Sequence, residues 1–290
     1  MKLRIADLIL EVACKADELE RLPNFVPFAV PDEGREEAVC RIDTGCSLRE
    51  EDGAPQLVSS IGDKRLALWL YPDHCSVSLA FGEDGLCYRL RADRCWRRVQ
   101  TNWVPGYADS AFALNDFIML AFTYCSAFCR TVLVHASSVV IAEDGCAFIG
   151  PSGIGKSTHS RLWTRYIPGA WLLNDDQPVL RCMPDGAVHI YGSPWSGKTF
   201  CYENQSARLR ALFFMEQASA NRLLPVSRVE AFRKLMAATS LIGRDAFTFS
   251  AISETQACIA GAVPGFILEN RPEKAAALLS YAAFDEERRK

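Results

Sequence analysis

Residues 150–158 read Gly150-Pro151-Ser152-Gly153-Ile154-Gly155-Lys156-Ser157-Thr158, and this stretch decides the fold class of the second half of the chain. It matches the pattern GxxxxGKS/T, in which the backbone N–H groups of a glycine-rich turn surround a phosphate group. In that pattern the lysine neutralises charge and the hydroxyl holds Mg²⁺. The pattern needs a strand before it and a helix after it. Cys146–Ile149 is a short apolar run, and a helical pattern extends from Lys156 to Tyr166. We therefore expect all nine residues to bind the phosphates of a nucleotide.

The same pattern occurs a second time, at Gly192–Thr199 (GSPWSGKT). Pro194 lacks a backbone N–H, and Trp195 is bulky at a point where backbone has to touch phosphate. The residues after this match do not begin a convincing helix, and no carboxylate pair follows them. We expect the first match to be the phosphate loop. The second match either lines the same cleft or forms an ordinary loop around a buried tryptophan, and Lys198 within it is a weaker candidate for phosphate contact.

Two adjacent carboxylates, Asp175 and Asp176, follow the short apolar strand expected at Trp171–Leu173. Mg²⁺ prefers oxygen ligands and usually takes one or two carboxylates together with phosphate oxygens. Two acids at a strand end can divide the work, since one can hold the metal and the other can accept the proton of an attacking hydroxyl. We assign the metal to Ser157 and Asp175. The alternative is a turn whose acids only cap a helix or carry surface charge.

His135 lies in the apolar segment Leu133–Ser138, fifteen residues before Gly150. A single histidine in an apolar strand is usually a core residue with satisfied hydrogen bonds. One hairpin separates this histidine from the glycine loop, so it could lie against the γ-phosphate or against the second aspartate. Arg161 is a weaker candidate for phosphate contact, because the helix after the loop would carry it one turn too far away.

The composition excludes several classes of protein. The 290 residues include 49% hydrophobic and 23% charged residues with a net charge of −3, which argues against a nucleic-acid partner. The apolar stretch 111–141 contains Asn115, Asp116, Arg130 and His135, so we expect no membrane span. The twelve cysteines contain no CxxC pair, and we expect most to be reduced and buried in a cytoplasmic protein. A homo-oligomeric state is left open.

The chain divides by pattern into a β-rich segment, residues 1–105, and an α/β segment, residues 106–290. Alternating residues at Arg65–Tyr71 and Ser76–Phe81 predict an antiparallel sheet in the first segment. Strands alternate with helices in the second segment, which is typical of the α/β class within an α+β chain. The helices are expected at Asp109–Arg130, Arg228–Thr239, Ile252–Ala262 and Glu273–Phe284.

Three motifs, LVHAS at 133–137, GPSGIGKST at 150–158 and LLNDD at 172–176, together resemble the HPr kinase/phosphorylase family. The catalytic domain of that family shares its P-loop type with ATP-dependent phosphoenolpyruvate carboxykinase. The resemblance implies a C-terminal P-loop domain with a mixed central sheet, and ATP and Mg²⁺ as cofactors. It also implies transfer of the γ-phosphoryl group to a serine hydroxyl by an aspartate base that a histidine assists. On this resemblance His135, Lys156, Asp175 and Asp176 are the catalytic residues.

The chain departs from that family at several points. Thr158 stands where the family has glutamate, the family's C-terminal glycine-rich stretch is not recognisable, and GSPWSGKT is similar to HPr kinase-related proteins instead. We therefore expect the acceptor to be a hydroxyl of a peptide, protein or small molecule other than HPr. One alternative is a nucleotide-binding regulatory or scaffold protein without phosphotransfer. The other is a phosphoenolpyruvate carboxykinase-like enzyme, which is disfavoured because the additional metal-binding lysine and histidine are not found. The aspartate pair and His135 favour the kinase, because binding alone needs no base.

Overall fold

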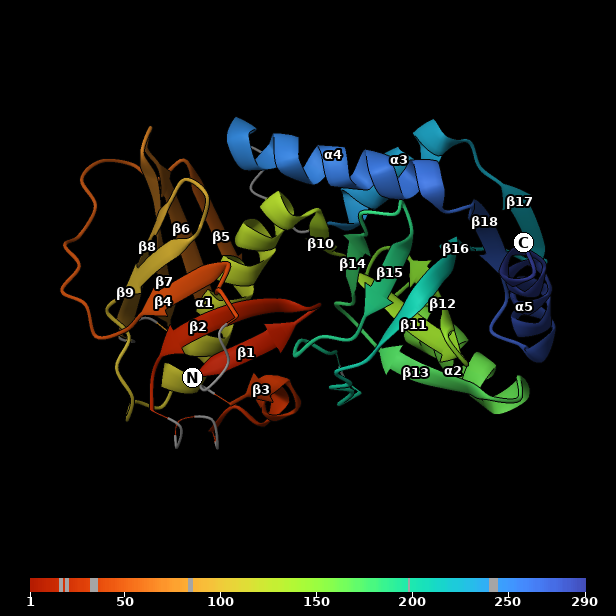
Figure 1. Cartoon of the computed structure of the whole chain (residues 1–290), viewed down its shortest axis with the longest axis horizontal. Coiled ribbons are helices and arrows are strands. Elements are labelled where there is room, and N and C mark those ends of the chain that lie inside the picture. The colour runs from red at the N-terminus through yellow and green to blue at the C-terminus, as the bar shows by residue number, and fades with distance from the viewer. Residues whose placement is uncertain (16–17, 19–20, 32–35, 83–85, 198, 240–244) are drawn as a thin grey trace. The chain divides into compact units, whose positions relative to one another are not determined.

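The computed structural model describes the chain except for residues 16–17, 19–20, 32–35, 83–85, 198 and 240–244 (Figure 1). The chain forms two compact units, one of Met1–Cys129 with Gly243–Phe249 and the other of Arg130–Ile242 with Ser250–Lys290. Each unit contains a mixed β-sheet and helices, so the chain belongs to the mixed α/β class that was expected. The division between the units falls after Cys129 and not after residue 105, because the helix that follows residue 105 packs on strands of the first sheet.

The first unit is built on a nine-stranded sheet. In spatial order its strands are β3 (Ala29–Val30), β1 (Lys2–Ile5), β2 (Leu8–Ala13), β4 (Cys40–Asp43), β9 (Arg98–Thr101), β8 (Cys87–Asp93), β7 (His74–Phe81), β6 (Lys64–Leu70) and β5 (Leu57–Ile61). Strands β5 to β9 form the antiparallel meander that the alternating pattern predicts. The expectation of a purely antiparallel sheet is wrong, because β4 runs parallel to both of its neighbours, β2 and β9.

Helix α1 (Ser110–Cys125) covers one face of this sheet, where it contacts β4 and β8. A 3-10 turn, Ser126–Cys129, extends it, and another 3-10 helix, Pro23–Phe28, precedes β3. By length and composition alone, Ser110–Cys129 would pass for a membrane span, contrary to the expectation that its polar residues exclude one. However, 67% of its apolar window is buried inside the protein, as expected of a core helix.

The second unit contains another nine-stranded sheet. Its main path runs β10 (Thr131–Leu133), β14 (Val179–Cys182), β15 (Val188–Tyr191), β16 (Ser206–Gln217), β12 (Asp144–Ile149), β11 (Ala136–Ile141) and β13 (Ala170–Asn174). Strand β18 (Gly265–Asn270) pairs with β16, and β17 (Arg222–Pro225) pairs with β18. Strand β16 runs parallel to β12 and β18 and antiparallel to β15, so the sheet is mixed.

Strand β11 lies next to the edge of this sheet, between β12 and the edge strand β13, and it is antiparallel to both. Consequently, the ends of β12 and β13 lie on either side of the beginning of β11. The apolar run 131–141 is divided between β10 and β11, which lie at different places in the sheet, and Val134 and His135 fall in the break. This topology brings the residues after Ile149 and after Asn174 next to His135.

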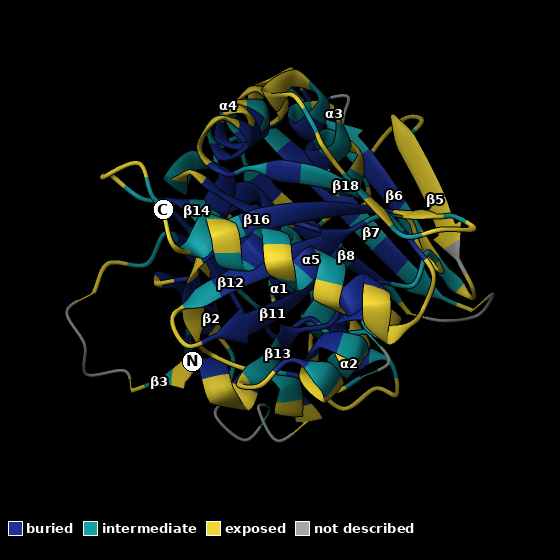
Figure 2. Cartoon of the chain, turned by 90° about the vertical axis from the view of Figure 1, so that its right-hand side faces the viewer, coloured by how far each residue is buried: buried dark blue, intermediate teal, exposed yellow. Residues whose placement is uncertain are grey.

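Four helices belong wholly or partly to the second unit, namely α2 (Lys156–Tyr166), α3 (Arg228–Ala238), α4 (Ala246–Ala262) and α5 (Lys274–Arg288). Figure 2 shows strands β11 and β12 almost entirely buried, as is the middle of β16, whereas α2 and α5 present exposed residues on one side. Trp163 of α2 is fully buried, and its ring lies 5.4 Å from that of Phe284 in α5 and 5.5 Å from that of Phe148 in β12. This aromatic cluster fixes α2 against the sheet.

Candidate functional site

The glycine loop Gly150–Gly155 connects the end of β12 directly to the beginning of α2, as the sequence pattern requires. Gly153 and Gly155 have φ angles of 80° and 110°, which L-residues with a Cβ rarely adopt. Open space surrounds both positions, so glycine is needed there for its backbone conformation and not for room. The chain can therefore turn sharply out of the strand and into the helix.

The helix after the loop begins with unpartnered N–H groups. The N–H of His159 donates to the carbonyl of Gly155 at 2.9 Å, which makes it the first N–H to bond within the helix. The preceding N–H groups of Lys156, Ser157 and Thr158 have no partner inside the helix, as at any helix N-terminus. Ser157 is half-buried and Thr158 is exposed. Together with the positive end of the helix dipole, these groups form a favourable environment for phosphate oxygens.

Lys156 folds back over the loop, and its side chain is buried. Its Nζ donates to the carbonyl oxygens of Gly150 at 2.8 Å and Pro151 at 3.2 Å, and it lies 2.9 Å from Nε2 of His135. Only 7% of Lys156 is exposed. Burial lowers the pKa of the ammonium group, and the negative charges of Asp176 and Asp175 oppose that shift. The two aspartates are therefore near enough to the loop lysine to act on its charge.

His135 connects the loop to the second aspartate. Its Nε2 faces Lys156 Nζ, and its Nδ1 lies 3.1 Å from Oδ1 of Asp176. An ammonium group can only donate, so Nε2 accepts and the ring hydrogen lies on Nδ1, from which it is donated to Asp176. The backbone N–H of His135 donates to the carbonyl of Ala238 at 2.7 Å, which fixes the residue in the break between β10 and β11. Of the two positions expected for this histidine, it occupies the one against the second aspartate.

Asp175 points the other way, into a buried group of hydroxyls. Ser137 Oγ donates to Asp175 Oδ1 at 2.9 Å, and Ser160 Oγ lies 2.6 Å from Ser137 Oγ. Each hydroxyl has one hydrogen, so when Ser137 donates to the carboxylate, the hydrogen of Ser160 has two acceptors, Ser137 Oγ and the carbonyl oxygen of Lys156 at 3.2 Å. Asp175 is 6% exposed. Its orientation is thus fixed by β11 and α2 together.

Asn174, the residue before the pair, holds the turn. Its Oδ1 accepts the N–H groups of Asp176 at 2.9 Å and Gln177 at 2.8 Å, which bends the chain sharply after β13. Its Nδ2 donates to the carbonyl of Trp195 at 3.1 Å. Sequence reasoning did not assign a role to Asn174, although an asparagine at the end of an apolar strand is itself a turn signal.

The second glycine motif lies beside the aspartates but lacks the structure of a phosphate loop. The described residues after it, 199–205, form no helix, and the next element in the chain is β16 at Ser206. A Cβ at Gly197 would lie 3.2 Å from the carbonyl oxygen of Asp175 and 3.4 Å from Cβ of Asp176. Trp195 is buried. The context therefore favours the first motif as the phosphate loop, and the second motif borders the same carboxylates. Lys198 lies outside the described residues.

Arg161 lies apart from this cluster. It is exposed on α2, and its Nε donates to the carbonyl of Ser157 at 3.1 Å, within its own helix. The structure thus brings together Lys156, His135, Asp175 and Asp176, and it does not bring Arg161 to them.

Magnesium was expected at Ser157 and Asp175, and both side chains carry oxygen atoms. Among the described residues, no group of three or more His, Cys, Asp and Glu could hold a metal ion by itself. Mg²⁺ usually takes only one or two carboxylates and completes its octahedron with phosphate oxygens and water. Ser157 and Asp175 each carry an oxygen group of this kind, and in this structure the Asp175 carboxylate accepts a hydrogen bond from Ser137.

A cavity of about 440 Å³ adjoins the loop on the side of β16 and α3. His135, Gly150 and Pro151 line it at one end, and Met215 belongs to its apolar wall. Polar side chains are few, and two of them, Lys234 and Glu216, pair with each other at 2.9 Å. A group bound at Lys156 would therefore have an apolar cavity next to it.

No protein-family model matches the chain, and no curated protein matches its sequence. Among solved structures, the chain is similar to the Hpr(Ser) kinase/phosphatase from Coxiella burnetii, with 15% sequence identity and a TM-score of 0.34. The similarity covers 54% of this chain and 90% of that one. The relationship is distant and gives this chain neither an activity nor a substrate. We therefore base the function on the geometry of the loop and its neighbours.

Proposed function

We propose that this chain is a kinase that binds ATP with Mg²⁺ at Gly150–Thr158 and transfers the γ-phosphoryl group to a hydroxyl of a peptide, protein or small molecule. The observation that carries the proposal is the hydrogen-bonded line from Lys156 through His135 to Asp176. This line joins a phosphate-binding cation to a carboxylate that can accept a proton.

The loop accounts for nucleotide binding. N–H groups at the start of α2, permissive glycines at 153 and 155 and a buried ammonium group at Lys156 are the features that a triphosphate requires. Lys156 Nζ now bonds two loop carbonyls, and phosphate oxygens would be stronger acceptors for the same hydrogens. Bound Mg²⁺ would neutralise charge that develops on the phosphates, with Asp175 and Ser157 as its protein ligands.

Asp176 accounts for transfer. The acceptor's hydroxyl oxygen forms a bond to the γ-phosphorus while the bond from that phosphorus to the bridging oxygen breaks, and the hydroxyl proton passes to Asp176. His135 donates to Oδ1 of Asp176 and so orients the carboxylate. The remaining oxygen can face the hydroxyl. A chain that only bound nucleotide would not need this arrangement, which is why we prefer a kinase to a scaffold.

The cavity beside the loop has the lining of a small-molecule site. It borders His135 and Gly150, which contact Asp176 and Lys156, so a molecule inside it would be separated from the proposed base by the His135 side chain. Its walls are mainly apolar, as is usual in small-molecule sites.

A screen with labelled ATP tests the proposal. Free serine, serine-containing peptides and small alcohols would be incubated with the protein, ATP and Mg²⁺, and labelled products would be separated. The proposal predicts a phosphorylated acceptor with wild-type protein and none with Asp176→Asn, which should still bind ATP. Tight ATP binding without transfer to any acceptor would favour the scaffold. Failure of wild-type protein to bind ATP would overturn the phosphate-loop assignment.

A further inference from the structure

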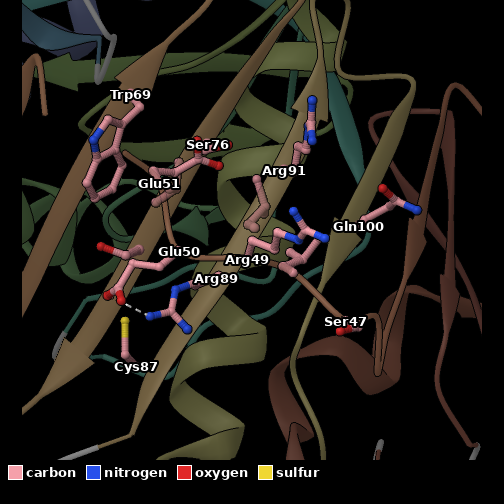
Figure 3. Close-up of a pocket in the computed structure, with 14 residues that line it drawn as sticks. Ser47, Arg49, Glu50, Glu51, Trp69, Ser76, Cys87, Arg89, Arg91 and Gln100 are labelled. Carbon is pink, nitrogen blue, oxygen red and sulfur yellow. Dashed lines mark hydrogen bonds and ion pairs between the residues drawn. The ribbon is translucent and has the colours of Figure 1, made fainter. Parts of the chain in front are cut away.

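The first unit contains a pocket of about 500 Å³ that the proposed kinase site does not use. It lies on the face of the sheet opposite α1, under the segment that connects β4 to β5 (Figures 1 and 3). The beginning of this segment is fixed where Cys46 N–H donates to the carbonyl of Thr101 at 2.9 Å. Its far end is fixed where Trp69 Nε1 donates to the carbonyl of Gly53 at 3.1 Å. Residues 47–52 therefore cross the sheet as a strap held at both ends.

The floor of the pocket is a row of side chains aligned by strand register. Trp69 of β6 pairs with Ser76 of β7, Ser76 pairs with Arg91 of β8, and Arg91 pairs with Gln100 of β9. Successive side chains of a strand alternate between faces, so all four share the face away from α1. Figure 3 shows Trp69 and Gln100 at opposite ends of the pocket.

Ser76 is an unusual residue for this floor. It is 3% exposed, and its Oγ makes no hydrogen bond to any of the residues that the structure describes. A buried hydroxyl without a partner costs free energy, about 1–3 kcal/mol in mutational data, so such groups are rare unless a ligand or water satisfies them. Ser76 lines the pocket. A ligand in the pocket would give it a partner.

Three arginines converge on the same space. Arg49 belongs to the strap, and Arg89 and Arg91 belong to β8. Arg89 forms an ion pair with Glu50 at 2.9 Å, and the other acidic side chain of the lining, Glu51, accepts a hydrogen bond from the Tyr71 hydroxyl, which raises the pKa of Tyr71. Both acids are thus occupied. Arg49 has no ion pair or side-chain hydrogen bond among the residues described here.

Arg91 also lacks a suitable hydrogen-bond acceptor among the described residues. Its guanidinium lies 3.3 Å from Nδ1 of His74, but that nitrogen lies closer, 2.8 Å, to Oδ1 of Asp73. The shorter contact assigns the ring hydrogen to Nδ1, which then donates to Asp73 and cannot accept from Arg91. The hydrogen bond from His74 lowers the pKa of Asp73, and the positive charge of Arg91 also contributes to lowering it. Two guanidinium groups are therefore available to a ligand.

We propose that this pocket binds an oxyanion, a carboxylate or a phosphate, carried on a flat apolar body. Arg49 and Arg91 bind the anion, because a guanidinium matches both groups with two parallel hydrogen bonds. Ser76 donates its hydroxyl hydrogen to the same ligand. Trp69 supplies the apolar surface for the body of the ligand. The site is separate from the glycine loop, and it does not depend on the chain being a kinase.

The test uses the full chain with three probes that share one ring: benzoate, phenyl phosphate and neutral benzamide. Binding is followed by calorimetry and by the NMR signal of the Trp69 indole N–H, at low salt because salt screens exposed charges. Every titration is repeated in Lys156→Ala, so that phosphate cannot bind at the glycine loop. At least one of the two anions should bind, with benzamide at least about tenfold weaker. The anion that binds more tightly identifies the ligand class.

Two variants and one control decide whether this pocket is the site. Arg91→Gln should weaken anion binding at least about tenfold, and Ser76→Ala about threefold or more. Ser76→Ala should leave thermal stability unchanged or raise it, because it removes an unsatisfied hydroxyl, and this separates a binding defect from a folding defect. Arg65→Gln is the control, since Arg65 is exposed on the same face but does not line the pocket. If neither anion shifts the Trp69 signal, or if Arg91→Gln and Arg65→Gln bind anion equally well, the proposal is overturned.

Discussion

Nε2 of His135 lies 2.9 Å from Nζ of Lys156, although 21 positions separate the two residues in the sequence. Strand register explains this proximity. Ala136 pairs with Ile149 across the β11–β12 hairpin, so the residue before one lies opposite the residue after the other, at the beginning of the glycine loop. Lys156 then reaches back over the loop to the same point. The imidazole therefore serves as a contact between the phosphate-binding loop and the aspartate at the end of β13.

Replacement of the loop lysine should strongly weaken nucleotide binding. Lys156→Ala removes a buried ammonium group beside the expected phosphates, and we expect ATP affinity to fall by about a hundredfold, as for the loss of a charge-assisted hydrogen bond. Titration calorimetry with ATP and Mg²⁺ measures the change. Arg161→Gln is the matched control, because Arg161 is exposed on the same helix and bonds only within it. An equal loss in both variants would contradict the assignment of Lys156.

Replacement of the second aspartate should separate binding from transfer. Asn in place of Asp176 keeps an oxygen that can accept from His135 Nδ1, but it cannot take up a proton. We expect ATP affinity to stay within about threefold and phosphoryl transfer to fall at least about a hundredfold, the usual range for loss of a general base. Transfer is measured in the labelled-ATP screen. Asp185→Asn, in the exposed turn between β14 and β15, should change neither quantity.

His135 should act as a positioning residue whose loss changes the pH profile. His135→Asn cannot bridge Lys156 and Asp176 at the same time, so the carboxylate loses its orientation. We expect transfer to fall by about ten- to a hundredfold, less than for Asp176→Asn, with a shifted acid limb of the pH–rate profile. His189→Asn in β15 is the control, since the backbone of His189 pairs with Arg181 and Arg208 and its ring lies 6.2 Å from that of Tyr191. An unchanged pH profile in His135→Asn would show that the histidine is only structural.

His159 should make stability depend on pH. Burial lowers the pKa of this histidine from 6.5 to about 4. Between these values the unfolded chain binds a proton that the folded chain does not, so the free energy of unfolding falls as the pH drops from 6.5 towards 4. By about pH 4 this lowers the free energy of unfolding by about 3 kcal/mol. Above pH 6.5 the titration of His159 no longer changes the free energy of unfolding.

Urea unfolding of wild-type protein and His159→Gln at pH 7.5, 6, 5 and 4.5 measures this contribution. The variant should lose less stability than wild type between pH 6.5 and pH 4.5. The same replacement at His189, which is only partly buried, should leave the pH dependence as in wild type. The prediction would be contradicted if the free energies of unfolding of wild type and His159→Gln differed by the same amount at every pH.

An added methyl group should destabilise the protein more at Gly192, in the second glycine motif, than at Gly186, where there is open space. A Cβ on Gly192 would lie 1.9 Å from the carbonyl oxygen of Glu203, so backbone would have to move. We expect Gly192→Ala to lower the free energy of unfolding by at least about 3 kcal/mol, the upper range for overpacking. Gly186→Ala has open space and a φ of 86°, so it should cost only about 1–2 kcal/mol. Urea unfolding at neutral pH compares the two, and equal costs would contradict the steric explanation.

Much of the candidate site follows from local sequence patterns. Helix α2 spans Lys156–Tyr166 as the pattern predicts, and the strands before the loop and before Asp175 lie within a residue or two of the expected ranges. These elements are predicted correctly because each depends on a short stretch of sequence: an apolar run, a glycine turn or a helical spacing of apolar residues.

The rest depends on contacts between distant segments. Strand β18 was not predicted, because Gly265–Asn270 becomes a strand only when β16 offers it a parallel partner. Helix α4 begins at Ala246 and not at Ile252, since residues such as Phe247 and Phe249 are weak helix formers by propensity alone. The hydrogen bonds of Asn174 to Trp195 and of Ser137 to Asp175 join elements that no local pattern relates.

Ser280 has a consequence for the order in which the site can form during synthesis. Trp163 Nε1 donates to its hydroxyl oxygen at 2.8 Å, and His159 Nε2 lies 2.9 Å from the same atom, so two side chains of the loop's helix share one residue of α5. That residue is translated 121 positions after His159. Because chains emerge from the ribosome N-terminus first, α2 must wait without these bonds until α5 has left the exit tunnel. A nascent chain would therefore contain the complete glycine loop before it could hold the loop's helix in place.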